Sequence, residues 1–161
     1  MNQASADSNL PFWLRPPAGA LFVLVLLAIR LFVAAESGLV RDEAYYALWS
    51  LHPQWGYMDH PPMIGWLVGL GRLVTDSPLG VRLLASLSTA VTSFALYQTG
   101  RLLFDPRTAA VAAIWFNLTL AMGLLFIATP DAPVVMFWSL SIWAVAEFVA
   151  RGNPNWWLLA G

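Results

Sequence analysis

The strongest constraint in this sequence is a long apolar segment over residues 18–35, interrupted only by Arg30. At about 1.5 Å of rise per residue, a helix of this length nearly crosses a hydrocarbon core of about 30 Å, so the segment predicts a membrane-spanning helix. A cleaved signal peptide is the alternative, because residues 33–35 (VAA) fit a cleavage site. The length of the apolar region, Arg30 and the weak positive charge before it argue against cleavage.

Composition supports a membrane protein. Of the 161 residues, 59% are hydrophobic and 11% are charged, whereas a soluble domain has about 45–50% apolar and about 25% charged residues. All eight basic residues are Arg and the formal net charge is -1, so no basic stripe for nucleic acid is expected. The chain has no Cys, which excludes disulfides and thiolate catalysis.

Further apolar segments predict an all-α, polytopic transmembrane helix bundle. The expected spans are residues 18–35, 83–100, 108–128 and 133–150, and a fifth apolar run starts near residue 156. We divide the chain into a cytoplasmic or interfacial segment, 1–17, and a membrane domain, 18–161. Because an apolar run is starting where the sequence stops, we expect the chain to be part of a longer protein.

Short links between the later spans require antiparallel neighbours, which fixes the side of each charged residue. Arg15, Arg101, Arg107 and Arg151 fall on one side, and Arg41, Arg72 and Arg82 on the other. The positive-inside rule then places the N-terminus in the cytoplasm and the connection 36–82 outside. Six of the nine acidic residues lie on the outer side: Glu36, Asp42, Glu43, Asp59, Asp76 and Asp131.

The outer connection is too apolar for a floppy loop. Residues 42–51 predict a short helix in which Tyr45, Leu48, Trp49 and His52 form one amphipathic face. Residues 63–74 are apolar but too few to span, which is typical of an interfacial or re-entrant helix. We therefore expect a structured first outer loop that carries interfacial helices.

Ionisable residues of this outer face are the candidates for chemistry, because such groups are costly to keep beside a membrane. Asp42 and Asp131 each have a structural alternative as a helix N-cap. Because successive helix positions are turned by about 100°, Asp42 and Glu43 cannot both face one small pocket, and we favour Asp42.

The segment Asp59-His60-Pro61-Pro62 predicts a helix that starts at the prolines. His60 would then lie at a helix N-terminus, where backbone amides and the helix dipole favour an anion such as phosphate. The alternative is that Asp59 caps the helix and His60 packs on Trp55 or Tyr57. Arg30 has two interpretations, snorkelling to the interface or holding a phosphate inside the bundle.

Three segments carry a family resemblance: residues 41–50 (RDEAYYALWS), 56–63 (GYMDHPPM) and 129–133 (TPDAP). Their order resembles the N-terminal part of the polytopic GT-C glycosyltransferases. The nearest resemblance is to bacterial relatives of the protein O-mannosyltransferases and of the aminoarabinose lipid A transferases.

The resemblance implies a multi-pass enzyme of the bacterial inner (plasma) membrane. Such an enzyme moves a sugar from a polyprenyl-phosphate carrier to a lipid, glycan or protein acceptor at the extracytoplasmic face. It maps the catalytic acid to Asp42, with Glu43 beside it, and a second acidic site residue to Asp131. It places the carrier phosphate near His60, where some relatives have Lys.

From these residues we expect Asp42 to act as the base of an inverting transfer. Asp59, His60, Tyr57 and Arg82 are the candidate substrate-binding residues, with Arg72 as a further phosphate ligand. No cofactor is certain, and a divalent cation bridging Asp42 and Asp131 is an option. Two alternatives stay open: a transporter-like subunit that uses Arg30 and Glu147, and a truncated, non-catalytic remnant. We expect the 161 residues alone to be inactive.

Overall fold

The computed structural model describes residues 11–119 and 127–161, and all of its regular elements are helical. They are the 3-10 turn η1 (Phe12–Leu14) and the helices α2 (Pro16–Glu36), α3 (Arg41–Leu51), α4 (Met63–Arg72), α5 (Pro78–Leu103), α6 (Pro106–Leu118), α8 (Asp131–Arg151) and α9 (Pro154–Ala160). The predicted all-α class is confirmed. Residues 1–10 of the predicted N-terminal segment and 120–126 of the predicted third span lie outside the described residues.

Three described helices, α2, α5 and α8, are long and apolar enough to cross a membrane. The prediction of one continuous helix over residues 108–128 is wrong. Helix α6 ends at Leu118, because Thr119 has an extended backbone with ψ of 138°. Its 13 residues correspond to about 20 Å, shorter than the hydrocarbon core.

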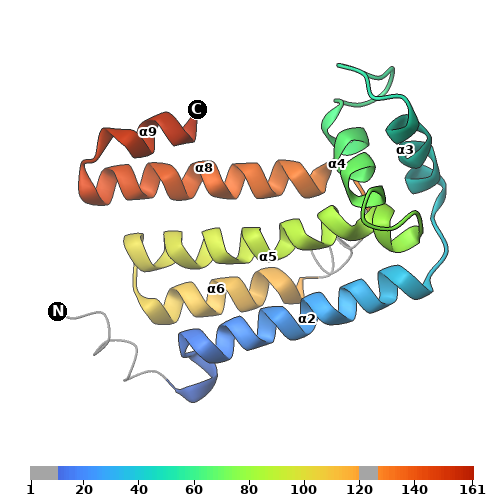
Figure 1. Cartoon of the computed structure of the whole chain (residues 1–161). Helices are drawn as coiled ribbons and strands as arrows, with labels where there is room; N and C mark the ends of the chain where they lie inside the picture. Colours follow the sequence, from blue (N-terminus) through green and yellow to red (C-terminus); the bar gives the residue numbers. More distant parts are fainter. Residues whose placement is uncertain (1–10, 120–126) are drawn as a thin grey trace.

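Helices α2, α5, α6 and α8 lie side by side, and α5 contacts the other three (Figure 1). Consecutive helices of these four run in opposite directions, as the short links require (Figure 1). Helices α3 and α4 gather at one end of this bundle, beside the end of α2 and the starts of α5 and α8 (Figure 1). We call this end the α3–α4 end and the other the α9 end.

Two glycines permit the corner between α4 and α5. A Cβ on Gly71 would lie 2.1 Å from the carbonyl oxygen of Gly80, and a Cβ on Gly80 would lie 1.8 Å from that of Thr75. Both distances are far below contact distance, so these positions require a residue without a side chain. The corner brings Arg72, at the end of α4, back toward α3.

A buried polar cluster joins α2, α5 and α6 inside the bundle. The Nη1 of Arg30 donates to Thr89 Oγ1 at 3.1 Å and to Asn117 Oδ1 at 2.9 Å. The Nδ2 of Asn117 donates in turn to Ser93 Oγ at 2.7 Å. Arg30 is therefore buried among neutral polar groups, and it does not snorkel to the interface.

Candidate functional site

Glu43 is the structural anchor of the α3–α4 end. It is 0% exposed, and its two carboxylate oxygens accept from Arg82 Nε at 2.7 Å and Arg82 Nη2 at 2.6 Å. They also accept from the backbone amides of Val40 at 3.0 Å and Ala128 at 2.9 Å. Burial by itself raises the pKa of Glu43, but the hydrogen bonds from Arg82 and the two amides outweigh it and lower the pKa. An ionised Glu43 thus ties α3 to α5 and to the segment before α8.

Arg82, a predicted phosphate ligand, is 1% exposed and faces protein groups. Besides Glu43, its Nη1 donates to the carbonyl oxygens of Ala34 at 3.1 Å and Ser37 at 2.9 Å. Its Nη2 donates to the carbonyl oxygen of Gly38 at 2.7 Å. These contacts fasten the end of α2 to α3, and they leave no support for the phosphate role.

Asp42 points away from Glu43, as the rotation between consecutive helix positions requires. It is exposed and lines a cavity of about 630 Å³, together with Arg41, Ala44, Tyr45, Tyr46, Leu48, Asp59 and His60. The N-cap alternative for Asp42 is wrong, because Val40 occupies that position and Asp42 belongs to the first turn. The Asp42 carboxylate is therefore available to a ligand in this cavity.

Tyr46, which the sequence did not single out, is influenced by the charges of three acidic residues. Burial raises the pKa of its phenol, and so do the negative charges of Asp42, Asp131 and Asp59. Carboxylates from three separate segments thus act electrostatically on one phenol. The His60 ring is 5.8 Å from the ring of Tyr46, at an edge-on angle.

The predicted amphipathic face of α3 is not the face that packs, and only Trp49 of its four residues is buried. Tyr45 is 41% exposed and Leu48 is 61% exposed, whereas Glu43, Tyr46 and Trp49 are buried. The ion pair of Glu43 with Arg82 explains the difference, because it fixes the rotation of α3 and turns the row 43, 46, 49 inward. Tyr45 and Leu48 therefore stay exposed and line the cavity.

The Asp-His-Pro-Pro segment leads into α4 as predicted. Pro62 precedes the helix, which begins at Met63, and no side chain caps it. The alternative that Asp59 caps α4 finds no support, because its Oδ2 instead accepts from Tyr45 Oη at 3.2 Å. His60 is exposed at the N-terminal side of α4 and lines the same cavity as Asp42.

Two other predicted ligands support this loop instead of lining the cavity. Tyr57 stacks on Trp49, with ring centroids 4.1 Å apart and parallel planes, and its Oη donates to the Trp49 carbonyl oxygen at 3.0 Å. Arg72 donates from Nη1 to the Ala47 carbonyl oxygen at 3.0 Å and pairs with Asp76 at 2.7 Å. Both side chains hold α3 against α4.

Asp131 is exposed at the start of α8, beside an apolar groove. Its N-cap alternative is wrong, because Pro130 occupies the N-cap position. The groove has a volume of about 320 Å³ and lies between Pro61, Met63 and Ile64 on one side and Pro130, Pro133, Val134, Phe137, Trp138 and Ser141 on the other. Since Pro61 follows His60 directly, the groove adjoins the acidic cavity.

The described residues contain no group of three or more His, Asp or Glu side chains placed to hold a metal ion. The predicted metal bridge between Asp42 and Asp131 stays a prediction, and we assign no step of the reaction to a metal.

Sequence comparison decides the family. Residues 59–161, more than half of the chain, match the family model described as dolichyl-phosphate-mannose-protein mannosyltransferase. The chain belongs to this family. No curated protein and no solved structure gave a match.

Membership in the mannosyltransferase family confirms the resemblance inferred from the three motifs. It supports a glycosyltransferase function in a membrane, and it gives no support to the transporter-like alternative. Asp59, His60 and Asp131 lie inside the matched range, whereas Asp42 and Glu43 precede it.

Proposed function

We propose that this mannosyltransferase-family protein transfers a sugar from a polyprenyl-phosphate carrier to an acceptor hydroxyl, with Asp42 as the general base. The observation that carries the proposal is the position of Asp42. It is exposed on a cavity that Tyr46 and Asp59 also line, and the negative charge of Asp131 acts on the same Tyr46 phenol. Glu43, one residue away, forms a buried ion pair with Arg82 and has a structural role.

In the proposed reaction, Asp42 takes the proton of the acceptor hydroxyl as its oxygen attacks the anomeric carbon. The bond between that carbon and the carrier phosphate breaks, and the phosphate leaves with an added negative charge. One displacement from the side opposite the leaving group inverts the anomeric carbon. Lipid, glycan and protein hydroxyls are all compatible acceptors.

The leaving phosphate needs stabilisation, and the start of α4 offers it. The uncapped N-terminus of this helix carries free backbone amides and the positive end of the helix dipole. His60 lies beside it and gives a charge-assisted hydrogen bond when protonated. We therefore place the carrier phosphate between His60 and the first turn of α4.

The apolar groove between α4 and α8 suits the carrier's hydrocarbon chain. It begins at Pro61, directly after the proposed phosphate position, and continues along α8 to Ser141. Aromatic and aliphatic walls bind such a chain without a specific polar contact. Because α8 is a candidate membrane span, the chain would enter the groove from the bilayer.

We place the cavity on the extracytoplasmic side of a bacterial plasma membrane. This assignment follows the charge distribution of the sequence, because the α9 end carries Arg15, Arg101, Arg107 and Arg151. The donor, the acceptor or both would then reach Asp42 from the outer leaflet.

A transfer assay tests the proposal. The full-length protein is reconstituted in vesicles with polyprenyl-phosphate mannose, and release of polyprenyl phosphate is measured. Asp42→Asn should lower turnover by about 10²–10⁴-fold, the usual contribution of a general base, with insertion unchanged. Glu36→Gln is the matched control, because Glu36 is an exposed acid at the same end that does not line the cavity. Turnover of Asp42→Asn close to wild type would eliminate Asp42 as the base.

A further inference from the structure

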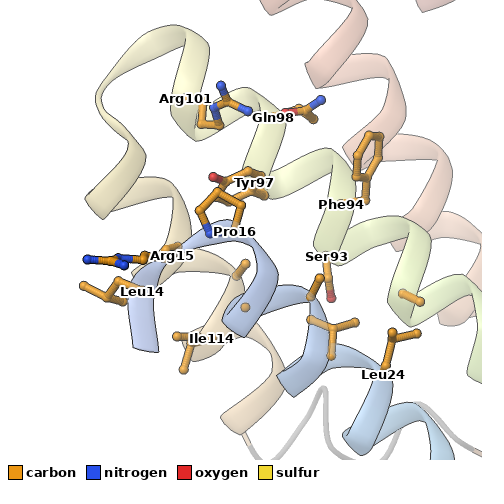
Figure 2. A pocket seen from close by; sticks show the side chains of 16 residues that line it. Leu14, Arg15, Pro16, Leu24, Ser93, Phe94, Tyr97, Gln98, Arg101 and Ile114 are labelled. Atoms are coloured by element: carbon orange, nitrogen blue, oxygen red, sulfur yellow. The ribbon is translucent and has the colours of Figure 1, made fainter. Parts of the chain in front are cut away.

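A second cavity lies at the α9 end of the bundle, away from the acidic cavity. It has a volume of about 430 Å³ and is formed by α2, α5 and α6 (Figure 2). Its walls are mainly apolar and include Val23, Leu24, Phe94, Ala110 and Ile114. Arg15 and Arg101 lie at the same cavity, as Figure 2 shows.

The cavity is far from Asp42 along the membrane normal. Arg82 lies near the start of α5 and Arg101 near its end, so the helix rises about 28 Å between them. That distance is close to the thickness of the hydrocarbon core. Arg101 therefore lies at the opposite membrane interface from the proposed transferase site.

Arg101 has a positive charge that the described part of the chain does not neutralise. Its guanidinium carbon lies 5.5 Å from the centre of the Tyr97 ring, and no ion pair with a carboxylate is found there. The nearby acids are engaged elsewhere: Asp105 caps α6, and Glu147 pairs with Arg151. The side chain is only half-exposed, so an anion that meets it is partly shielded from water.

We propose that an anionic phospholipid binds in this cavity, with its phosphate at Arg101 and one acyl chain against the apolar walls. Arginine is well suited to phosphate, and basic pockets between membrane helices on the cytoplasmic side are typical sites for anionic lipid headgroups. The apolar walls include side chains of α2 and α5, two helices long enough to span the bilayer, so an acyl chain can reach them laterally. A phospholipid is the membrane component that combines both chemistries.

Native mass spectrometry of the full-length protein in neutral detergent tests the headgroup. We expect retained phosphatidylglycerol and little retained phosphatidylcholine. Arg101→Gln should lower phosphatidylglycerol affinity by about fivefold, the contribution of one basic residue near a membrane surface. Arg107→Gln is the control, because Arg107 is an exposed arginine at the same end that does not line the cavity.

Gly19→Leu tests the acyl-chain position. Gly19 lines the cavity, and a Cβ built there meets no atom within 4 Å, so a side chain can start at this position without a backbone clash and extend into cavity space. Lipid retention should fall while the melting temperature of the lipid-free protein stays the same or rises. Ala18→Leu, at a neighbouring position outside the lining, should retain the lipid.

Four results would each overturn the proposal: equal retention of both lipids, equal loss in Arg101→Gln and Arg107→Gln, full displacement by inorganic phosphate, or a change of oligomeric state in Gly19→Leu. The first two indicate nonspecific binding. The third indicates a simple anion site, and the fourth indicates that a second copy of the chain covers the cavity.

Discussion

Replacing Glu43 by Gln should destabilise the protein more than any single change at an exposed acid. The substitution keeps the shape of the side chain and removes its charge. The carboxylate now accepts four hydrogen bonds, two from Arg82 and one each from the amides of Val40 and Ala128. A Gln side chain has one acceptor oxygen, and its NH2 group would face donors.

The magnitude follows from burial. Both members of the ion pair are almost fully buried, so neither can recover its lost partner from water. Breaking such a pair from one side costs about 3–5 kcal/mol. At about 2–4 °C per kcal/mol for a chain of this size, the melting temperature should fall by roughly 6–20 °C. Replacing both residues by Leu should not restore stability, because the amide of Ala128 and the carbonyls that Arg82 binds would lose their partners.

Thermal unfolding in detergent, followed by the loss of monodisperse protein, measures this effect. Asp76→Asn is the matched control, because its ion pair with Arg72 is largely exposed and should contribute less than about 1 kcal/mol. If Glu43→Gln lowers the melting temperature no more than Asp76→Asn does, Glu43 and Arg82 do not anchor this end of the bundle.

Three further predictions concern the donor, the α4–α5 corner and pH. His60→Ala should raise the KM for the polyprenyl-phosphate sugar more than it lowers kcat. An unchanged KM would show that His60 does not bind the phosphate. Met58→Ala, at an exposed neighbouring position, is the control. Gly80→Ala should lower the free energy of unfolding by more than about 1 kcal/mol, because its Cβ would clash with the Thr75 carbonyl oxygen. Gly38→Ala should lower it much less, because a Cβ there meets no atom within 4 Å. Equal melting temperatures of the two variants would refute the close packing at this corner. Because the pKa of Glu43 is lowered by folding, its stabilisation is complete above the unfolded pKa of about 4.3 and is lost as the pH falls through the lower, folded value. The melting temperature of Glu43→Gln should therefore depend less on pH below about 4.3 than that of the wild type, and parallel curves would contradict this assignment.

The sequence predicted the elements that depend on local pattern. Apolar length located α2, α5 and α8, and the prolines after His60 located the start of α4. Alternation of spans also predicted that Asp42, His60 and Asp131 would reach one end of the bundle, because short links leave no other arrangement.

Long-range pairing was not predictable. Glu43 and Arg82 are 39 positions apart. Glu43 was placed beside the catalytic Asp42 and Arg82 among the substrate-binding residues, because burial cannot be recognised from residue type alone. The same pair turns Glu43 and Tyr46 inward together with Trp49, so of the predicted amphipathic face only Trp49 is buried, and Tyr46 was missed. The early end of α6 was also missed, because residues 108–128 are mostly apolar, carry no charge and contain no Gly or Pro before Gly123.

The central claim is that Asp42 and Asp131 lie at one membrane face, opposite Arg101 at the end of α5 and Arg107 at the start of α6. The chain contains no Cys, so single-cysteine variants at Asp42, Asp131 and Arg107 can each be labelled with a membrane-impermeant maleimide in intact cells. The account predicts labelling of Asp42→Cys and Asp131→Cys from outside, and labelling of Arg107→Cys only after the membrane is opened. Labelling of Asp42→Cys and Asp131→Cys from opposite sides would contradict it.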